Sequence, residues 1–518
     1  MDNLRSIREK KDVVLFLPRK NAVNTGTEQM PPLQLLALAR VLISSEYNVK
    51  IIDATIENDY IDKIIQNCEG ALCLGISCII GYQIYDGVNI AKIVRKRFPD
   101  LPIVFGGWFP SVEPALFLKE GVANVVVRGQ GEKTFYELVE SIRNHSSLET
   151  IMGISYKKNG VIVSNPDRHT EDINSFPPMP YHLIDIDRYI SSDPYVIDTV
   201  ASNRRRFEKD FKFRVLHYFS SIGCPDNCKF CCSPGVTKRK WSALDPIRMA
   251  NEIEGLIEQH RFNFLIFLDS NFVLSEKRVK VFCEEILRRH IRLRWNAFGE
   301  ARPLSRYSKE TLDLMKLSGC CEVFIGAESS CDKTLYLMDK HITHEEVRES
   351  IDLLITRNIT PRVAFIVGFP DESKESIDET IKTYYDLRMK YPSIDLRINV
   401  FYPLPGSGFY SRALQLGFKG PKTLEEWSGI TRDNVKKTMP IPDCLTTSQL
   451  QKVTYYRDIF FKWGFDIIWE RPNLNYIQRS LQRIALFRLK TKILALPIEF
   501  WLYGQISRLI HLIRRYLL

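Results

Sequence analysis

The chain has 518 residues, of which 45% are hydrophobic and 26% are charged. This composition excludes a disordered chain or a collagen-like repeat, and the length suggests about three domains at ~100–200 residues per domain. The formal net charge is +10, and most of the excess lies in residues 479–518, which hold eight basic residues and one acid. The positive charge therefore belongs to a C-terminal tail, and the rest of the chain is close to neutral.

The N-terminal stretch 1–16 is charged and lacks the continuous apolar core of a secretory signal. No segment reaches the ~18 uncharged apolar residues that a transmembrane helix needs. We therefore expect a cytoplasmic protein. The twelve cysteines are unevenly spaced, and a reducing compartment does not favour disulfides.

Residues 1–145 alternate short apolar runs with amphipathic segments, and the runs lie at 13–18, 49–53, 71–77, 102–107 and 123–129. Parallel strands that are buried on both faces have this pattern, so we predict a doubly wound, Rossmann-like α/β domain. Such sheets bind ligands at the carboxyl ends of their strands. The residues at these ends include Asp53, Ser77, Gly106, Gly107, Gly129, Gln130 and Glu132.

Residues 146–212 are expected to form a hairpin and a linker. The segment 151–165 contains Asn159-Gly160, a pair that favours the positive φ angles of a tight β-turn. The Pro-rich stretch 176–180 then marks the linker.

Residues 213–420 contain six strand–helix units. Their apolar strands are expected to begin near 214 and to follow at 264–269, 293–298, 322–328, 362–369 and 396–404. This pattern predicts a partial (β/α)6 barrel of the TIM type, with an active site at the carboxyl ends of its strands.

Three cysteines, Cys224, Cys228 and Cys231, form a Cys-x3-Cys-x2-Cys loop directly after the first barrel strand. Thiolates are the usual ligands of iron–sulfur clusters, and three of them would leave one iron of a [4Fe–4S] cluster open. The alternative is a zinc site completed by Cys232 or His217. Four further cysteines could hold an auxiliary cluster, or they could be buried as small hydrophobic residues. They are Cys283, Cys320, Cys321 and Cys331.

The cysteine loop resembles that of radical S-adenosylmethionine (SAM) enzymes. Four later segments resemble motifs of one subgroup, in which a cobalamin-binding domain precedes the barrel: FLDSNF (267–272), GAESS (326–330), VGFPDES (367–373) and YPLPGSGFY (402–410). The resemblance implies that Cys224, Cys228 and Cys231 ligate a [4Fe–4S] cluster whose open iron binds SAM. It also implies SAM contacts from Phe230, Ser270, Arg302 and Glu328, although Glu328 could instead be a structural acid that pairs within the barrel.

The N-terminal domain is similar to the cobalamin-binding domain of this subgroup in its segments 29–42, 51–57, 74–77, 106–111 and 125–135. The resemblance implies that cobalamin is bound by Trp108 together with the strand-end residues given above. The alternative is a Rossmann-like domain that only supports the barrel. The chain has no histidine before His145, so this domain cannot offer an imidazole to the lower face of cobalt.

Residues 421–518 are expected to be mostly helical. Apolar residues from Ile506 to Leu517 recur at helical spacing, with basic residues opposite them. This basic, aromatic tail over 479–518 suits either peripheral contact with the inner membrane surface or packing against the barrel. Nucleic acid is not expected as a partner, because long aliphatic runs need burial in protein or lipid.

The resemblance implies a cobalamin-dependent radical SAM methyltransferase. A 5′-deoxyadenosyl radical would remove hydrogen from an unactivated carbon of a small lipophilic molecule or secondary metabolite, and methylcobalamin would supply the methyl group. An external donor of the flavodoxin or ferredoxin type would supply electrons, and no side chain is assigned a catalytic role. Two alternatives are an oxidative cyclase resembling the magnesium-protoporphyrin cyclases and a cobalamin sensor or carrier with a silent barrel.

Overall fold

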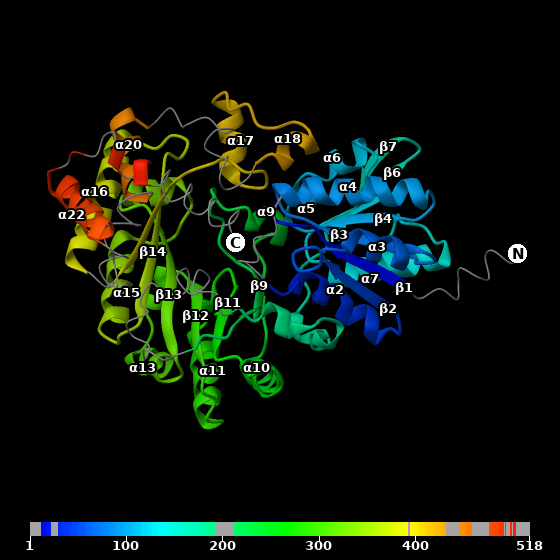
Figure 1. Ribbon diagram of the computed structural model, residues 1–518, viewed down its shortest axis with the longest axis horizontal. Coiled ribbons are helices and arrows are strands. Elements are labelled where there is room, and N and C mark those ends of the chain that lie inside the picture. Colours follow the sequence, from blue (N-terminus) through cyan, green and yellow to red (C-terminus); the bar gives the residue numbers. More distant parts are fainter. Residues whose placement is uncertain are drawn as a thin grey trace, which may run out of the picture.

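The computed structural model describes residues 12–21, 30–191, 212–391, 394–430, 445–457 and 476–491, together with 493, 498–499 and 501–503. It contains two α/β units that lie side by side (Figure 1). The predicted helix over 506–518 lies outside the described residues.

The first unit is built on a seven-stranded sheet with the order β2-β1-β3-β4-β5-β6-β7. Its strands are β1 (Asp12–Leu17), β2 (Asn48–Asp53), β3 (Cys73–Ser77), β4 (Ile103–Gly106), β5 (Val125–Val127), β6 (Ile154–Lys158) and β7 (Val161–Ser164). The first five strands are parallel. They coincide with the five apolar runs, so the predicted doubly wound domain is confirmed.

Helices cover both faces of this sheet, and side chains of β1 alternate between the two layers. Val14 and Phe16 join a core with α3 (Tyr60–Cys68), α4 (Tyr82–Arg97), α5 (Trp108–Val112) and α6 (Pro114–Lys119). Val13 and Leu15 join a core with α2 (Leu33–Ser44) and α7 (Glu132–Asn144). Because every β1 side chain after Asp12 is buried, the strand reads as a continuous apolar run.

The predicted hairpin is confirmed, and it extends the first sheet. Asn159 and Gly160 have φ angles of 52° and 81°, as a two-residue turn of this kind requires. Strand β6 pairs antiparallel with β5 as well as with β7. Three short 3₁₀ helices follow in the linker at Ile173–Ser175, Tyr181–Leu183 and Ile186–Tyr189.

The second unit is a six-stranded parallel sheet with the order β15-β14-β13-β12-β11-β8. Its strands are β8 (Val215–Tyr218), β11 (Phe264–Phe267), β12 (Arg294–Gly299), β13 (Cys320–Glu328), β14 (Thr360–Val367) and β15 (Asp395–Val400). Within the described residues no pairing joins β8 to β15, so the barrel is open. The predicted partial (β/α)6 barrel is confirmed.

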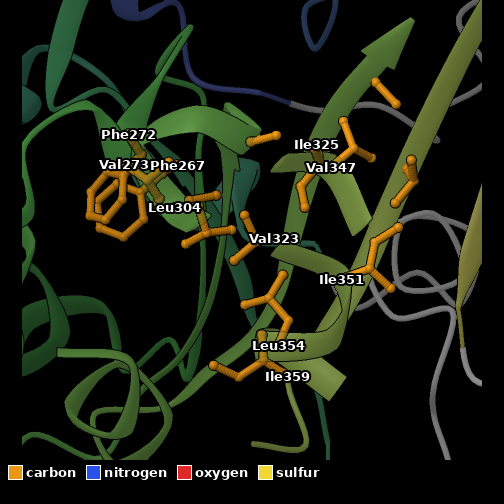
Figure 2. Packing of buried hydrophobic residues seen from close by; sticks show 14 of the residues in the cluster. Phe267, Phe272, Val273, Leu304, Val323, Ile325, Val347, Ile351, Leu354 and Ile359 are labelled. Carbon is orange, nitrogen blue, oxygen red and sulfur yellow. The ribbon is translucent and has the colours of Figure 1, made fainter. Parts of the chain in front are cut away.

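The barrel helices pack on the outer face of these strands. They are α10 (Pro246–His260), α11 (Glu276–Arg288), α12 (Ala301–Ser305), α13 (Lys309–Leu317), α14 (Asp332–Leu337), α15 (His344–Ile355) and α16 (Lys374–Lys390), with a 3₁₀ helix at Phe272–Leu274. Figure 2 shows Val323 and Ile325 of β13 beside Val347 and Ile351 of α15. On β8 and β11 the opposite face carries a smaller apolar cluster of Phe213, Val215, Phe264 and Ile266.

After the barrel strands, the chain forms α17 (Gly408–Gln415), α18 (Leu424–Ser428), α20 (Thr447–Tyr455) and α22 (Tyr476–Thr491). Of these, α18 lies beside α4 of the first unit, and α20 and α22 lie beside α16 of the barrel (Figure 1). Trp427 of α18 is buried, with its ring centroid 5.2 Å from that of Phe109. The Tyr455 hydroxyl donates to the Ala485 carbonyl at 2.9 Å, so one face of α22 packs on the barrel side.

Candidate active site

The three spaced cysteines lie on one loop between β9 (Ser221–Gly223) and α9 (Ser233–Thr237). Strand β9 pairs antiparallel with β10 (Trp241–Ala243), which fixes both ends of the loop. Gly223 has φ 80°, and a Cβ there would lie 2.0 Å from the Lys240 carbonyl oxygen. Only glycine fits before Cys224, so the loop starts in a defined direction.

Contacts with two later barrel elements hold this loop in place. The backbone N–H of Lys229 donates to the Met338 carbonyl at 2.8 Å, and that of Phe409 donates to the Lys229 carbonyl at 2.7 Å. The Phe230 ring packs 5.9 Å from that of Phe369. The loop is therefore clamped between the α14–α15 connection and α17.

The donor set fits an iron–sulfur cluster. Cys224, Cys228 and Cys231 are free thiols, and Cys228 is buried. Burial raises the pKa of the Cys224 thiol to about 12 and also raises the pKa values of Cys228 and Cys231. Ionisation of these thiols therefore needs a bound cationic metal group, as for thiolate ligands in general.

Two carboxylates at strand ends share one buried ammonium group beside the loop. The Lys340 Nζ lies 3.4 Å from Glu300 Oε1 and 3.8 Å from Glu328 Oε1. Burial raises the pKa of Glu300 to about 7 and also raises that of Glu328. Both Lys340 and Glu328 act electrostatically on Cys228, so Glu328 lies near the cysteine loop, and its contact with SAM stays a prediction.

Glu300 and Lys340 were not found by sequence reasoning. Glu300 directly follows strand β12, which ends at Gly299, so the rule that ligands bind at strand ends could have identified it. Lys340 lies in the connection between α14 and α15. No local pattern there indicates a functional residue.

The other expected SAM contacts have different surroundings. Phe230 is half-buried in the cysteine loop, with the Lys340 Nζ 5.8 Å from its ring centroid. Ser270 is exposed at the end of β11 and borders the cavity described next. Arg302 lies in α12, and its Nε lies 3.3 Å from Oε1 of Glu346 in the first turn of α15.

A cavity of about 430 Å³ lies between the two units. Seven of the eight residues expected to bind cobalamin line it: Ser77, Gly106, Gly107, Trp108, Gly129, Gln130 and Glu132. The barrel contributes residues on both sides of the cysteine loop, among them Phe219, Gly223, Ser233 and Ser270. Residues that directly flank the cysteine loop, Gly223 and Ser233, therefore line the cavity.

The eighth residue, Asp53, is not among the cavity-lining residues. Its Oδ1 accepts bonds from the backbone and hydroxyl of Thr55 at 2.8 and 2.7 Å, and its Oδ2 accepts from the Tyr189 hydroxyl at 2.9 Å. The structure therefore places Asp53 at the end of β2, where it joins the following turn to the linker.

The cavity walls suit a large, mainly apolar ligand with amide groups. Leu33, Leu38 and Phe135 supply apolar surface. The Trp108 Nε1 and Gln130 Nε2 atoms are buried and make no hydrogen bond within the described part of the chain. Unpaired buried donors need an acceptor, and the amide-bearing corrin ring of cobalamin offers several.

Comparison with protein families matches both units. Residues 20–139 match the B12 binding domain, and residues 218–384 match the radical SAM superfamily. The chain is a cobalamin-binding radical SAM enzyme. It works with a [4Fe–4S] cluster, SAM and cobalamin. This rejects the two alternatives, a zinc site at the cysteine loop and a Rossmann-like domain that only supports the barrel.

Relatives of this radical SAM enzyme include methylases and cyclases. An uncharacterized methyltransferase of Pyrococcus horikoshii is 28% identical over 78% of this chain and 83% of its own length. The anaerobic magnesium-protoporphyrin IX monomethyl ester cyclase of a Synechocystis strain is 26% identical over 69% of each chain. The solved structure of the cobalamin-dependent SAM radical enzyme OxsB, with aqua-cobalamin and SAM bound, is 17% identical, covers 97% of this chain and 76% of its own, and has a TM-score of 0.69.

Proposed function

We propose that this enzyme transfers a methyl group to an unactivated carbon of a small molecule. The observation that carries the proposal is that the residues on both sides of the cysteine loop line the interdomain cavity. The bound cofactors would supply the chemistry, with SAM giving an organic radical and cobalamin a methyl group. The task of the chain is to hold these reactive groups and the substrate carbon in contact, because proximity of this kind lowers the barrier.

In this proposal Cys224, Cys228 and Cys231 hold the cluster, and an external donor of the flavodoxin or ferredoxin type reduces it. Phe230, within the cluster loop, contacts SAM, and Glu328 faces the bound SAM. Ser270 contacts SAM from beyond the end of β11, and Arg302 contacts it from α12, which follows the neighbouring strand β12. The buried position of Glu328 next to the loop supports its role.

The seven cavity-lining residues hold cobalamin, with Trp108 and Gln130 donating hydrogen bonds to it. Asp53 supports this site indirectly, because its hydrogen bonds to Thr55 and Tyr189 hold the turn after β2 in place. The described part of the cobalamin-binding domain before His145 contains no histidine. A bound cobalamin would therefore receive no imidazole ligand from the residues before His145.

The cyclase relative supports a second candidate, oxidative ring closure with the same cofactors. SAM labelled in its methyl group distinguishes the two reactions. We expect the anaerobic enzyme, supplied with reductant and a host lipid or metabolite extract, to form a product that carries the label. A product that has lost hydrogen but carries no label, detected by mass spectrometry, would replace methyl transfer by cyclisation.

We also propose that α22 places the enzyme at an anionic membrane surface, with a lipophilic substrate close by. Its Ala485 side is buried, whereas Ile477 and Phe487 are 59% and 61% exposed, beside the exposed Arg479 and Arg483. Basic helices with exposed apolar side chains bind the membrane interface. Among the described residues, no helix is both long and apolar enough to cross a membrane.

Replacing both Ile477 and Phe487 by serine should lower binding to anionic vesicles several-fold in a sedimentation assay, because apolar burial drives interfacial binding. Leu317→Ser is the matched control, because Leu317 is 70% exposed on α13. Equal vesicle binding by the double variant and the control would show that α22 only packs against the protein.

A further inference from the structure

A turn of three consecutive basic residues lies against the cysteine loop. Lys238, Arg239 and Lys240 join α9 to β10, and all three side chains are exposed. The Arg239 Nε donates a hydrogen bond to the Pro225 carbonyl at 3.4 Å, and Pro225 directly follows Cys224. The positive charge of this basic turn, residues 238–240, therefore lies at the surface next to the proposed cluster ligands.

The backbone holds the basic turn in one conformation. Lys238 and Arg239 have φ angles of 52° and 61°, in the left-handed region that glycine adopts freely and lysine or arginine only at a cost. The backbone N–H of Lys238 donates to the Pro234 carbonyl at 3.1 Å, and that of Lys240 donates to the Thr237 carbonyl at 3.0 Å. Two long cationic side chains thus occupy positions that favour glycine, which indicates that these side chains have a use of their own.

Little negative charge balances the basic turn. Lys238 Nζ lies 3.1 Å from Asp167 Oδ2, but Asp167 also pairs with Arg128, whose Nη1 lies 2.6 Å from its Oδ1. Within the part of the chain that the structure describes, Arg239 and Lys240 form no ion pair. The surface around the turn therefore keeps an excess of positive charge, which attracts an acidic partner.

The basic turn lies between the two proposed cofactor sites. On one side, the Lys240 carbonyl oxygen packs against Gly223, where a Cβ would come within 2.0 Å of it. On the other side, Val236 and Thr237 line the interdomain cavity. Only a few residues therefore separate a protein bound at this turn from the cluster loop and from the cobalamin cavity, and short distances favour electron transfer.

The composition of the surface fits an acidic protein better than a membrane. None of the apolar residues in 233–242, a segment that the structure describes in full, is exposed, whereas binding to a membrane interface buries apolar side chains. The only acid of the cysteine loop, Asp226, is half-buried, with its Oδ2 3.3 Å from the Cys224 Sγ. Every exposed charged side chain between positions 224 and 242 is therefore basic.

We infer that the basic turn is the docking surface of the electron donor, a small protein with acidic groups around its redox centre. The inference rests on the proposed reduction of a cluster at the cysteine loop, and it holds whether the enzyme methylates or cyclises its substrate. In each encounter the donor is oxidised by one electron and the cluster is reduced by one, with no transfer of a proton or chemical group. Opposite charges steer the donor to the turn, and salt screens them.

The charge reversal Arg239→Glu/Lys240→Glu tests this inference in the anaerobically reconstituted holoenzyme. The probe is an acidic flavodoxin, oxidised for binding measurements and reduced for turnover. We expect its Kd, measured by isothermal titration calorimetry at low salt, to rise by roughly tenfold or more. The KM for reduced flavodoxin in SAM cleavage should rise in parallel.

Two controls separate docking from damage to the cluster loop. Iron content and SAM cleavage driven by dithionite, a small reductant that needs no docking surface, should keep their wild-type values. Lys92→Glu/Lys96→Glu makes the same change of charge at two exposed lysines of α4, and it should bind flavodoxin as the wild type does. Failure of SAM cleavage with dithionite in the wild type would count only against the proposed function, because the Kd for flavodoxin is measured without turnover.

Salt gives an independent readout. The screening length falls from about 30 Å at 0.01 M ionic strength to about 10 Å at 0.1 M, so the wild-type Kd should rise by roughly tenfold over this range. The Kd of the charge-reversed variant should change little, and that of Arg239→Gln/Lys240→Gln should lie between the two at low salt. Equal Kd values in the wild type and the charge-reversed variant, or an equal loss in the α4 control, would overturn the inference. A charge reversal that weakens binding to anionic vesicles but not to flavodoxin would also overturn it, and would assign the turn to a membrane.

Discussion

Replacing Cys228 by alanine should abolish SAM cleavage and remove most of the iron from the enzyme. Cys228 is the most buried of the three spaced cysteines, with 8% of its surface exposed. A [4Fe–4S] cluster held by three thiolates has no spare protein ligand, and two thiolates would not retain it against loss to solvent. The wild-type enzyme should hold about four irons per chain, measured after anaerobic reconstitution, and form 5′-deoxyadenosine on reduction.

Cys232→Ala is the matched control for this experiment. Cys232 lies next to a proposed ligand on the same loop, and burial raises the pKa of its thiol to about 12. It falls outside the Cys-x3-Cys-x2-Cys spacing, so its variant should keep the iron and the SAM cleavage of the wild type. If Cys228→Ala still formed 5′-deoxyadenosine, the cluster would be held by other residues.

The layer structure of both units could be predicted from the sequence because burial on both faces makes parallel strands continuously apolar. β1 illustrates this: Val13 and Leu15 face one helix layer, and Val14 and Phe16 face the other. The return of α18 to the first unit could not be predicted. Trp427 reads as a buried aromatic residue, but nothing near it indicates Phe109, more than 300 positions earlier, as its partner.

The site was predictable where its residues are adjacent in sequence. The three cysteines lie within eight positions, and their spacing alone indicates the chemistry. Lys340 and Glu300 are forty positions apart and meet only because β12 and β13 are neighbours. Their pairing depends on the folded barrel, so no sequence pattern predicts it.

Position at a strand end also does not tell how a side chain is used. Asp53 ends β2 and Arg302 comes shortly after β12, as ligand-binding residues of such folds do. Asp53 accepts bonds from Thr55 and Tyr189, and Arg302 pairs with Glu346. Local partners of this kind compete for a polar side chain, and only the structure shows them.

Gly106→Phe should empty the cobalamin site while the barrel stays intact. Gly106 lines the interdomain cavity at the end of β4, and its φ angle is not positive. A Cβ there would meet only Val127 atoms, at 3.6 and 3.8 Å, which is ordinary contact. The backbone therefore tolerates a side chain, and a bulky one would compete with the ligand for the cavity.

We expect cobalamin retained after anaerobic gel filtration, measured from its absorbance, to fall by roughly tenfold in Gly106→Phe, because added bulk in a fitted site is not accommodated. Gly106→Ala should retain cobalamin, because its single methyl group meets nothing closer than 3.6 Å. SAM cleavage should persist in both variants, since the cysteine loop lies on the barrel side of the cavity. Normal cobalamin content in Gly106→Phe would mean that the corrin binds elsewhere on the first unit, and loss of iron would mean that the two sites depend on each other.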